Sequence, residues 1–177
     1  MLVVVTGGPG AGKTTLVEAL RKRGYAVVPE AARAIIRDQV AIGGRALHER
    51  DIELYAEITL TWDMRNHREA AGLPGPVFFD RGLPDRVGYQ IMRGLPVPPH
   101  VSAAVDLFRY HPVVFVAPPW PEIYVHDQER RHDWDHALRA YDVTVAGYTR
   151  AGYEPVTLPK VDVEARIGFV LDRLGIG

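Results

Sequence analysis

The sequence predicts an α/β fold, in which a five-stranded parallel sheet is covered by helices on both sides. Five short apolar segments alternate with longer segments of helical periodicity, and parallel strands need such helical crossovers between them. A glycine-rich loop between the first strand and the first helix is also typical of this class. A chain of 177 residues suits one domain with an ample core, so residues 1–177 are expected to form a single domain.

The composition is that of a globular protein, with 47% hydrophobic and 24% charged residues. The net charge is −1 and no long basic run occurs, so neither nucleic acid nor a membrane is expected as a partner. The first apolar run is far shorter than the roughly 20 residues of a membrane span, and we expect a cytoplasmic protein. Without cysteine, a disulfide framework, a thiolate metal site and a cysteine nucleophile are excluded. The oligomeric state is left open.

The first strand leads into the loop Gly7-Gly8-Pro9-Gly10-Ala11-Gly12-Lys13-Thr14. Leu2 to Thr6 is a continuous apolar run, typical of a strand buried on both faces, and Thr15 to Arg21 continues at helical spacing. The loop fits G-x-x-x-x-G-K-[ST], the phosphate-binding P-loop. Its glycines let successive backbone N–H groups converge on an anion at the positive end of a helix.

We therefore expect a nucleotide-binding domain whose nucleotide phosphates lie in this loop. The expected binding residues are Gly8, Pro9, Gly10, Ala11, Gly12, Lys13, Thr14 and Thr15. Catalytic Lys13 would reach the β- and γ-phosphates, and the Thr14 hydroxyl would bind Mg²⁺. ATP is preferred to GTP because the guanine signature N-K-x-D is absent. The expected cofactors are ATP and Mg²⁺.

A second strand is expected at Tyr25 to Val28, followed by a helix from Glu30 to Asp38. Glu30 and Arg33 would then lie just beyond the carboxyl end of a strand, where open α/β sheets bind ligands. We interpret both as substrate-binding residues, and Glu30 also as a catalytic base. The alternatives are a helix-start acid matched to the macrodipole for Glu30 and a solvated charge for Arg33.

A long helix is predicted from His48 to Ala71, a stretch without glycine or proline, with only its tip facing the site. The third strand, Val77 to Asp80, ends in a carboxylate and is followed by Arg81. An acid at this position can hold the Mg²⁺ hydration shell or take a proton from the acceptor. Arg81 can bind phosphate or substrate oxygens bidentately. We therefore expect Asp80 to serve in catalysis, metal binding and substrate binding, and Arg81 in substrate binding.

The remaining segments continue the alternation of helices and strands. Helices are expected at 83–93 and 102–109, a fourth strand at 113–117, a helix ending before Gly152, a fifth strand at 153–159 and a last helix at 161–174. The loop around Pro159 and Lys160 is a candidate contact for the nucleotide base.

The most polar part of the chain runs from Tyr124 to Arg139. One interpretation is a helical lid, at about residues 120–140, that closes over the phosphates. Arg130 and Arg131 would then be catalytic, because they would meet the charge that develops during phosphoryl transfer. The alternative is a solvated helix start with ion pairs.

Several stretches together resemble a known family. They are the P-loop, Pro29-Glu30-Ala31-Ala32-Arg33, Phe79-Asp80-Arg81-Gly82, Pro118-Pro119-Trp120, Asp127-Gln128-Glu129-Arg130-Arg131, and Gly152-Tyr153-Glu154 through Leu158-Pro159. The chain resembles the small AAA-type P-loop ATPase and kinase family, which includes the ribosylnicotinamide kinase domain of the bifunctional NAD regulator and the nucleotide-binding domain of the TRPL translocation defect protein. More distantly, Asp80-Arg81 and Arg130-Arg131 are similar to the acid–Arg pair and the lid arginines of nucleoside and nucleoside-monophosphate kinases.

This resemblance spans nearly the whole chain. It implies the P-loop NTPase fold of nucleoside and nucleotide kinases, a three-layer sandwich with a helical lid, and bound Mg-ATP. It leaves the acceptor open.

Two functions are compatible with these observations. The first is a Mg²⁺-dependent small-molecule kinase that transfers the ATP γ-phosphoryl group to a nucleoside, nucleotide or similar acceptor, held between Glu30 and Asp80. The second is a nucleotide-dependent switch or binding module, in which ATP or GTP orders the lid and a partner binds the ordered form. An ATPase activity fits either function.

Overall fold

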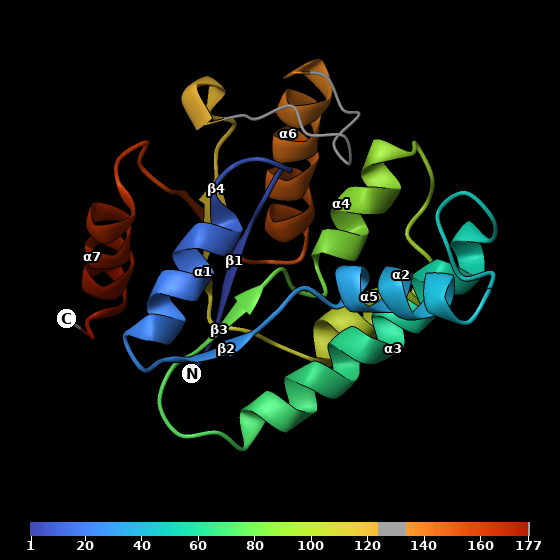
Figure 1. Cartoon of the computed structure of the whole chain (residues 1–177), viewed down its shortest axis with the longest axis horizontal. Helices are drawn as coiled ribbons and strands as arrows, with labels where there is room; N and C mark the ends of the chain where they lie inside the picture. The colour runs from blue at the N-terminus through green and yellow to red at the C-terminus, as the bar shows by residue number, and fades with distance from the viewer. Residues whose placement is uncertain (124–133, 177) are drawn as a thin grey trace.

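The computed structural model describes residues 1–123 and 134–176 and has the predicted α/β architecture (Figure 1). Its strands are β1 (Leu2–Gly7), β2 (Ala26–Val28), β3 (Val77–Asp80), β4 (Val113–Ala117) and β5 (Glu154–Thr157). Its helices are α1 (Lys13–Lys22), α2 (Ala31–Ala41), α3 (Ile52–Ala71), α4 (Asp85–Met92), α5 (Pro99–Leu107), the 3-10 helix η1 (Pro121–Ile123), α6 (Trp134–Arg150) and α7 (Val163–Leu174). The five strands pair in parallel, in the order β2-β3-β1-β4-β5.

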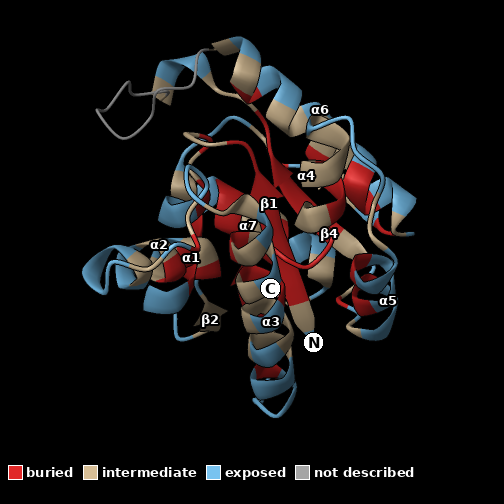
Figure 2. Ribbon diagram, turned by 90° about the vertical axis from the view of Figure 1, so that its right-hand side faces the viewer, coloured by how far each residue is buried: buried red, intermediate tan, exposed pale blue. Residues whose placement is uncertain are grey.

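The sheet is the middle of three layers, and its central strands β1, β3 and β4 are almost fully buried (Figure 2). Val3 and Val5 of β1 pack with α1 and α7, whereas Val4 between them packs with α3, α4, α5 and α6. This alternation follows from the opposite directions of successive side chains on a strand. Because both faces are covered, the central strands β1, β3 and β4 are largely apolar. The predicted fold class is confirmed.

The strand order places the functional residues at the carboxyl ends of neighbouring strands, along one side of the sheet. β1 lies between β3 and β4, with Val5 opposite both Asp80 and Phe115 in the registers of the two pairs. The loop that leaves β1 therefore begins beside the end of β3. Since all strands are parallel, their carboxyl ends meet at this edge, where α/β proteins bind ligands.

Helices α4 and α6 approach one another closely through two glycines. A Cβ atom added to Gly147 would lie 2.6 Å from the backbone nitrogen of Gly88, and one added to Gly88 would lie 2.8 Å from the carbonyl oxygen of Val143. Any larger residue at these positions would push the two helices apart. The contact sets the spacing between the start of α4 and the last turns of α6.

Two helices begin three or more residues away from their predicted starts. The long helix begins at Ile52 rather than His48, because Asp51 caps it by accepting a hydrogen bond from Leu54 N at 3.0 Å. Helix α5 begins at Pro99 rather than Ser102, since proline is tolerated in a first turn, where its missing N–H has no partner to lose. Among the described helices, none is long and apolar enough to cross a membrane.

Candidate functional site

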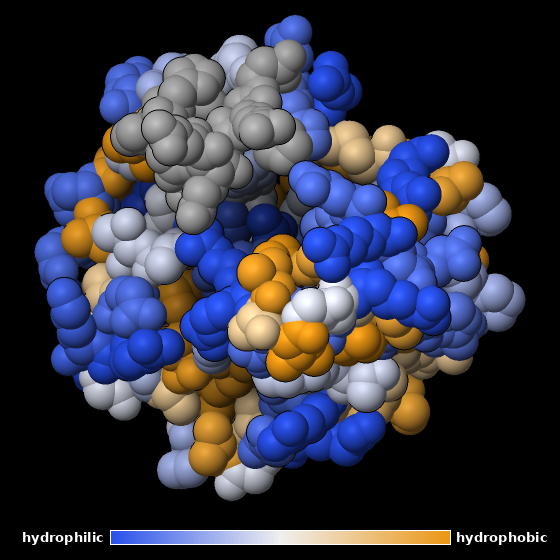
Figure 3. All heavy atoms as spheres, turned by 45° about the vertical axis from the view of Figure 1, so that its right-hand side comes forward, coloured by the Kyte–Doolittle hydropathy of each residue, from blue (hydrophilic) through white to orange (hydrophobic). Residues whose placement is uncertain are grey.

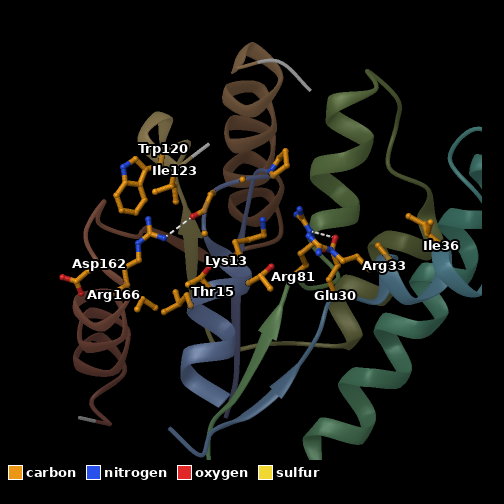
Figure 4. Close-up of a pocket in the computed structure, with 18 of the residues that line it drawn as sticks. Lys13, Thr15, Glu30, Arg33, Ile36, Arg81, Trp120, Ile123, Asp162 and Arg166 are labelled. Atoms are coloured by element: carbon orange, nitrogen blue, oxygen red, sulfur yellow. Dashed lines mark hydrogen bonds and ion pairs between the residues drawn. The ribbon is translucent and has the colours of Figure 1, made fainter. Parts of the chain in front are cut away.

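A pocket of about 1040 Å³ opens at the carboxyl edge of the sheet. Its walls come from the P-loop and from residues distant in sequence: Pro9–Leu16, Glu30, Ala32, Arg33, Ile36, Arg37, His48, Tyr55, Arg81, Trp120, Ile123, Val161–Val163 and Arg166. The close-up shows Lys13 between two groups of side chains, with Trp120 and Arg166 on one side and Glu30 and Arg81 on the other (Figure 4). A hollow with hydrophilic side chains at its base is also visible on the face shown in Figure 3.

The P-loop adopts backbone conformations that its glycines permit. Gly10 and Gly12 have φ angles of 72° and 78°, in the left-handed region that residues with a Cβ rarely occupy. Lys13 is buried, and its Nζ donates to the carbonyl oxygen of Gly8 at 2.6 Å. Burial, with the nearby charge of Arg81, lowers the pKa of Lys13 to about 8. Thr14 is exposed at the pocket wall, where its hydroxyl can meet a ligand.

The opposite wall carries an acid–arginine cluster. Arg81 Nε donates to Glu30 Oε1 at 2.8 Å, and Arg81 Nη1 donates to Asp85 Oδ1 at 3.2 Å. Although burial alone raises the pKa of Glu30, the charges of Arg81 and Lys13 outweigh it and lower that pKa. Glu30 is therefore a carboxylate that can accept a further hydrogen bond. Arg33 lies on the same wall, mostly exposed, with its Nε 3.6 Å from Glu30 Oε2.

Arg81 itself has a φ angle of 72°, and it is the one non-glycine residue with positive φ in the described part of the chain. Such a conformation is uncommon for a residue with a side chain and costs free energy, so it persists only where the surroundings hold it. The ion pairs to Glu30 and Asp85 are part of what holds it.

Asp80 lies at the end of β3 and is 8% exposed. Its Oδ1 has no hydrogen-bond partner in the described part of the chain. Burial raises the pKa of Asp80, and the charge of Lys13 opposes the shift. The neighbouring Arg81 forms its ion pairs with Glu30 and Asp85. The free oxygen suits a hard cation or a water molecule.

The structure thus brings most of the predicted site residues together. Lys13, Thr14, Glu30, Arg33 and Arg81 line one pocket, with Pro9, Gly10, Ala11, Gly12 and Thr15. The carbonyl oxygen of Gly8 accepts the hydrogen bond from Lys13. Asp80 does not line the pocket. It lies at the end of β3, opposite Val5 of β1, the strand that leads into the P-loop. Arg130 and Arg131 lie in residues 124–133 of the predicted lid, which are outside the described residues.

Sequence analysis missed the contact between Trp120 and Arg166. The Arg166 guanidinium carbon lies 4.6 Å from the centre of the Trp120 ring, and its Nη1 donates to Ala11 O in the P-loop at 3.1 Å. Nε donates to Pro159 O at 2.8 Å. Arg166 therefore fixes the P-loop to the loop that precedes α7. Its position in an ordinary helical pattern carried no signal of this role.

At the other end of the pocket, His48 and Tyr55 form an aromatic wall. Their ring centroids are 4.2 Å apart, and Ile36 of α2 also lines this end. The tip of the long helix faces the site, as expected, but neither ring had been assigned to it. Asp85 was also missed: it follows the Asp80-Arg81 pair closely in sequence and pairs with Arg81.

Comparison with solved structures shows similarity to kinases of low sequence identity. A deoxyadenosine kinase from M. mycoides superimposes with a TM-score of 0.68 and 15% identity, covering 99% of both chains. Thymidylate kinase from Ehrlichia chaffeensis gives a TM-score of 0.61 and 16% identity over 98% of both chains. NadR protein in complex with NR gives a TM-score of 0.74 and 20% identity, covering 99% of this chain but 51% of that chain, so this chain spans about half of NadR. At these identities the likeness establishes the fold.

No curated protein sequence matches this chain significantly. A family described as AAA domain matches residues 2–166. The matched range contains the P-loop, Glu30, the Asp80-Arg81 pair and Arg166. It covers most of the chain and confirms the family resemblance that these residues suggested. This chain belongs to the AAA domain family.

Proposed function

We propose that this protein is a Mg²⁺-dependent kinase that transfers the γ-phosphoryl group of ATP to a small acceptor of the nucleoside or nucleotide class. The observation that carries the proposal is that the P-loop and the acid–arginine cluster form opposite walls of one pocket. A site that only bound nucleotide would need the first wall alone. Solved kinases that act on deoxyadenosine and thymidylate share the fold, which supports the same reaction class.

On the donor side, the P-loop N–H groups and the Lys13 ammonium would hold the β- and γ-phosphates of ATP. A bound phosphate would replace Gly8 O as the partner of Lys13. Trp120 and Arg166 lie at this end of the pocket and would flank the nucleoside part of the donor.

The residues present fit a magnesium ion. The exposed Thr14 hydroxyl and the unpartnered Asp80 Oδ1 are oxygen donors, which Mg²⁺ prefers, and this ion usually takes only one or two protein ligands beside substrate phosphates. Thr14 would hold the ion directly, and Asp80 directly or through water. When bound, it would neutralise negative charge on the phosphates.

On the acceptor side, the ionised Glu30 carboxylate would accept a hydrogen bond from the attacking group and take its proton. Asp80 is the alternative base, and burial raises its pKa. Arg81 would bind substrate oxygens through the donors that Glu30 and Asp85 do not occupy. The His48 and Tyr55 rings would contact the body of the acceptor.

The test is a screen for acceptor-dependent ADP release. Wild-type protein is incubated with Mg-ATP and, separately, nucleosides, ribosylnicotinamide, nucleotides or sugars, and phosphorylated product is identified by mass. The proposal predicts a product with at least one class. Lys13→Ala is the control and should abolish turnover while the protein stays folded. Tight ATP binding without product from any class would contradict the kinase proposal and favour the switch.

A further inference from the structure

Asp85, the first residue of α4, accepts four hydrogen bonds, two on each carboxylate oxygen. Oδ1 accepts from Thr6 Oγ1 at 2.6 Å and from Arg81 Nη1 at 3.2 Å. Oδ2 accepts from Tyr148 Oη at 2.6 Å and from the backbone nitrogen of Gly82 at 2.9 Å. An ionised carboxylate has about four acceptor positions, so Asp85 is fully used.

The side chain of Asp85 is only 11% exposed. Such a buried charge is costly unless its hydrogen bonds are complete and a countercharge is near. Here Arg81 supplies the countercharge. Burial, together with the charge of Asp85, raises the pKa of Tyr148 well above its ordinary value, so its hydroxyl stays protonated and serves as a donor.

The four partners come from three parts of the site. Thr6 immediately precedes the P-loop, and Tyr148 lies on α6 next to Gly147, whose close contact with Gly88 sets the spacing of α4 and α6. Gly82 and Arg81 form the turn after β3, in which Arg81 has its left-handed backbone. We infer that Asp85 is a positioning residue, which holds the guanidinium of Arg81 against Glu30 and ties it to the strand that enters the P-loop.

A purely structural explanation accounts for only part of this geometry. Acids are common in the first turn of a helix, and the bond from Gly82 N lies within the turn that enters α4. Neither of these features requires Thr6, Tyr148 or Arg81. Through these side chains Asp85 connects Thr6, which precedes the P-loop, with Arg81, which lines the opposite wall of the pocket. This inference rests on the proposed kinase function.

The Asp63–Arg86 pair provides a matched control. Arg86 follows Asp85 on α4, and its Nη2 donates to Asp63 Oδ2 at 2.9 Å, with both side chains less than 20% exposed. Neither residue lines the pocket. Asp63→Asn therefore breaks a second buried ion pair on the same helix without touching Arg81, Glu30 or Thr6.

The first measurement reads Arg81 directly and needs no activity. Hydrogen exchange of the Arg81 Nε–H group is followed by NMR in the wild-type protein, Asp85→Asn and Asp63→Asn. Nε donates to Glu30, and only Nη1 donates to Asp85. If Asp85 holds the guanidinium in place, Asp85→Asn should loosen the Nε–Glu30 bond and speed exchange about tenfold or more. Asp63→Asn should leave it near the wild-type rate. Equal exchange in the wild-type protein and Asp85→Asn would overturn the inference.

The second measurement separates positioning from stability. Asp85→Asn should lower kcat about tenfold or more, with the KM for ATP nearly unchanged, whereas Asp63→Asn should keep the wild-type kcat. In an Arg81→Gln background, Asp85→Asn should have little further effect, because its role acts through Arg81. An undiminished further loss in that background would overturn the inference. If the wild-type protein phosphorylates no acceptor, the proposed function fails, and the exchange measurement alone still decides the role of Asp85.

Discussion

Glu30 Oε1 accepts a hydrogen bond from Arg81 Nε at 2.8 Å, which joins the N-terminus of α2 to the residue that follows β3. The two residues are 51 positions apart in sequence. Their pairing builds the wall of the pocket that faces Lys13.

Replacing Glu30 by glutamine keeps an oxygen for Arg81 but removes the carboxylate that would take the acceptor proton. General-base catalysis contributes about a hundredfold or more to rate, so Glu30→Gln should lower kcat by about that factor. ATP affinity should stay close to wild type, since the donor phosphates contact the P-loop. The matched control is Glu53→Gln, an exposed acid in the first turn of α3. A wild-type kcat in Glu30→Gln would assign the base to another residue.

Nucleotide binding should take up a proton at alkaline pH. The pKa of Lys13 is lowered to about 8 in the free protein, so Lys13 is largely neutral at pH 9. A bound phosphate favours the charged form and must therefore restore the proton. Affinity for a non-hydrolysable ATP analogue should fall by up to about tenfold per pH unit above this pKa. Calorimetry in two buffers of different ionisation enthalpy checks the prediction, and absence of proton uptake at pH 9 would refute it.

The same shift has a consequence for stability. Between the lowered pKa of about 8 and the ordinary 10.5, the unfolded chain binds more protons at Lys13 than the folded protein does. Its contribution to stability must therefore rise with pH across this window and be least favourable below pH 8. The unfolding free energy of the wild-type protein should therefore rise relative to that of Lys13→Met as the pH increases across this window. Denaturant midpoints of both proteins, measured at several pH values in the window, check this prediction. A pH-independent difference would show that Lys13 titrates normally.

Arg166→Met should weaken nucleotide binding and destabilise the protein. The change removes the donors to Ala11 O and Pro159 O, and Arg166 is only 3% exposed. We expect a loss of about 1–3 kcal/mol in unfolding free energy and about tenfold in ATP affinity. Arg173→Met is the control on the same helix. Its exposed pair with Glu154 should contribute less than about 1 kcal/mol, and ATP affinity should not change.

The glycine contact between α4 and α6 can be tested by adding one methyl group. In Gly147→Ala the new Cβ would lie 2.6 Å from Gly88 N, so the helices must separate, at a cost of about 1–3 kcal/mol. Gly168→Ala in α7 is the opposite case, because no atom lies within 4 Å of its added Cβ. That variant should gain about 0.5–1 kcal/mol from helix propensity. Equal thermal midpoints for the two variants would contradict the close approach of α4 and α6.

Local patterns carried the sequence prediction of the sheet and of the donor wall. Most strands contain an apolar run bounded by glycine, proline or polar residues, and the P-loop is a continuous motif. Glu30 and Arg81 could be placed near the P-loop because they follow strand ends, and the carboxyl ends of parallel strands share one edge.

Two of the contacts that sequence analysis missed are long-range. Arg166 is 155 positions from Ala11, and Tyr148 is 63 positions from Asp85. Such pairs depend on how helices pack across the sheet, which no local pattern encodes. Arg166 and Tyr148 each fall on a regular helical pattern, where a core or surface role is the simplest interpretation. Asp85 is an acid in the first turn of α4, a position that the helix dipole alone favours, so its residue type gives no sign of its other partners.

The most direct test of the central claim follows the γ-phosphoryl group itself. ATP labelled in the γ-phosphate is incubated with the wild-type protein and saturating acceptor from each class of the screen. If the two walls of the pocket hold donor and acceptor together, the label will appear in a phosphorylated acceptor, in an amount equal to the ADP formed. Label found only in ATP or inorganic phosphate, with every class of acceptor present, would contradict the account.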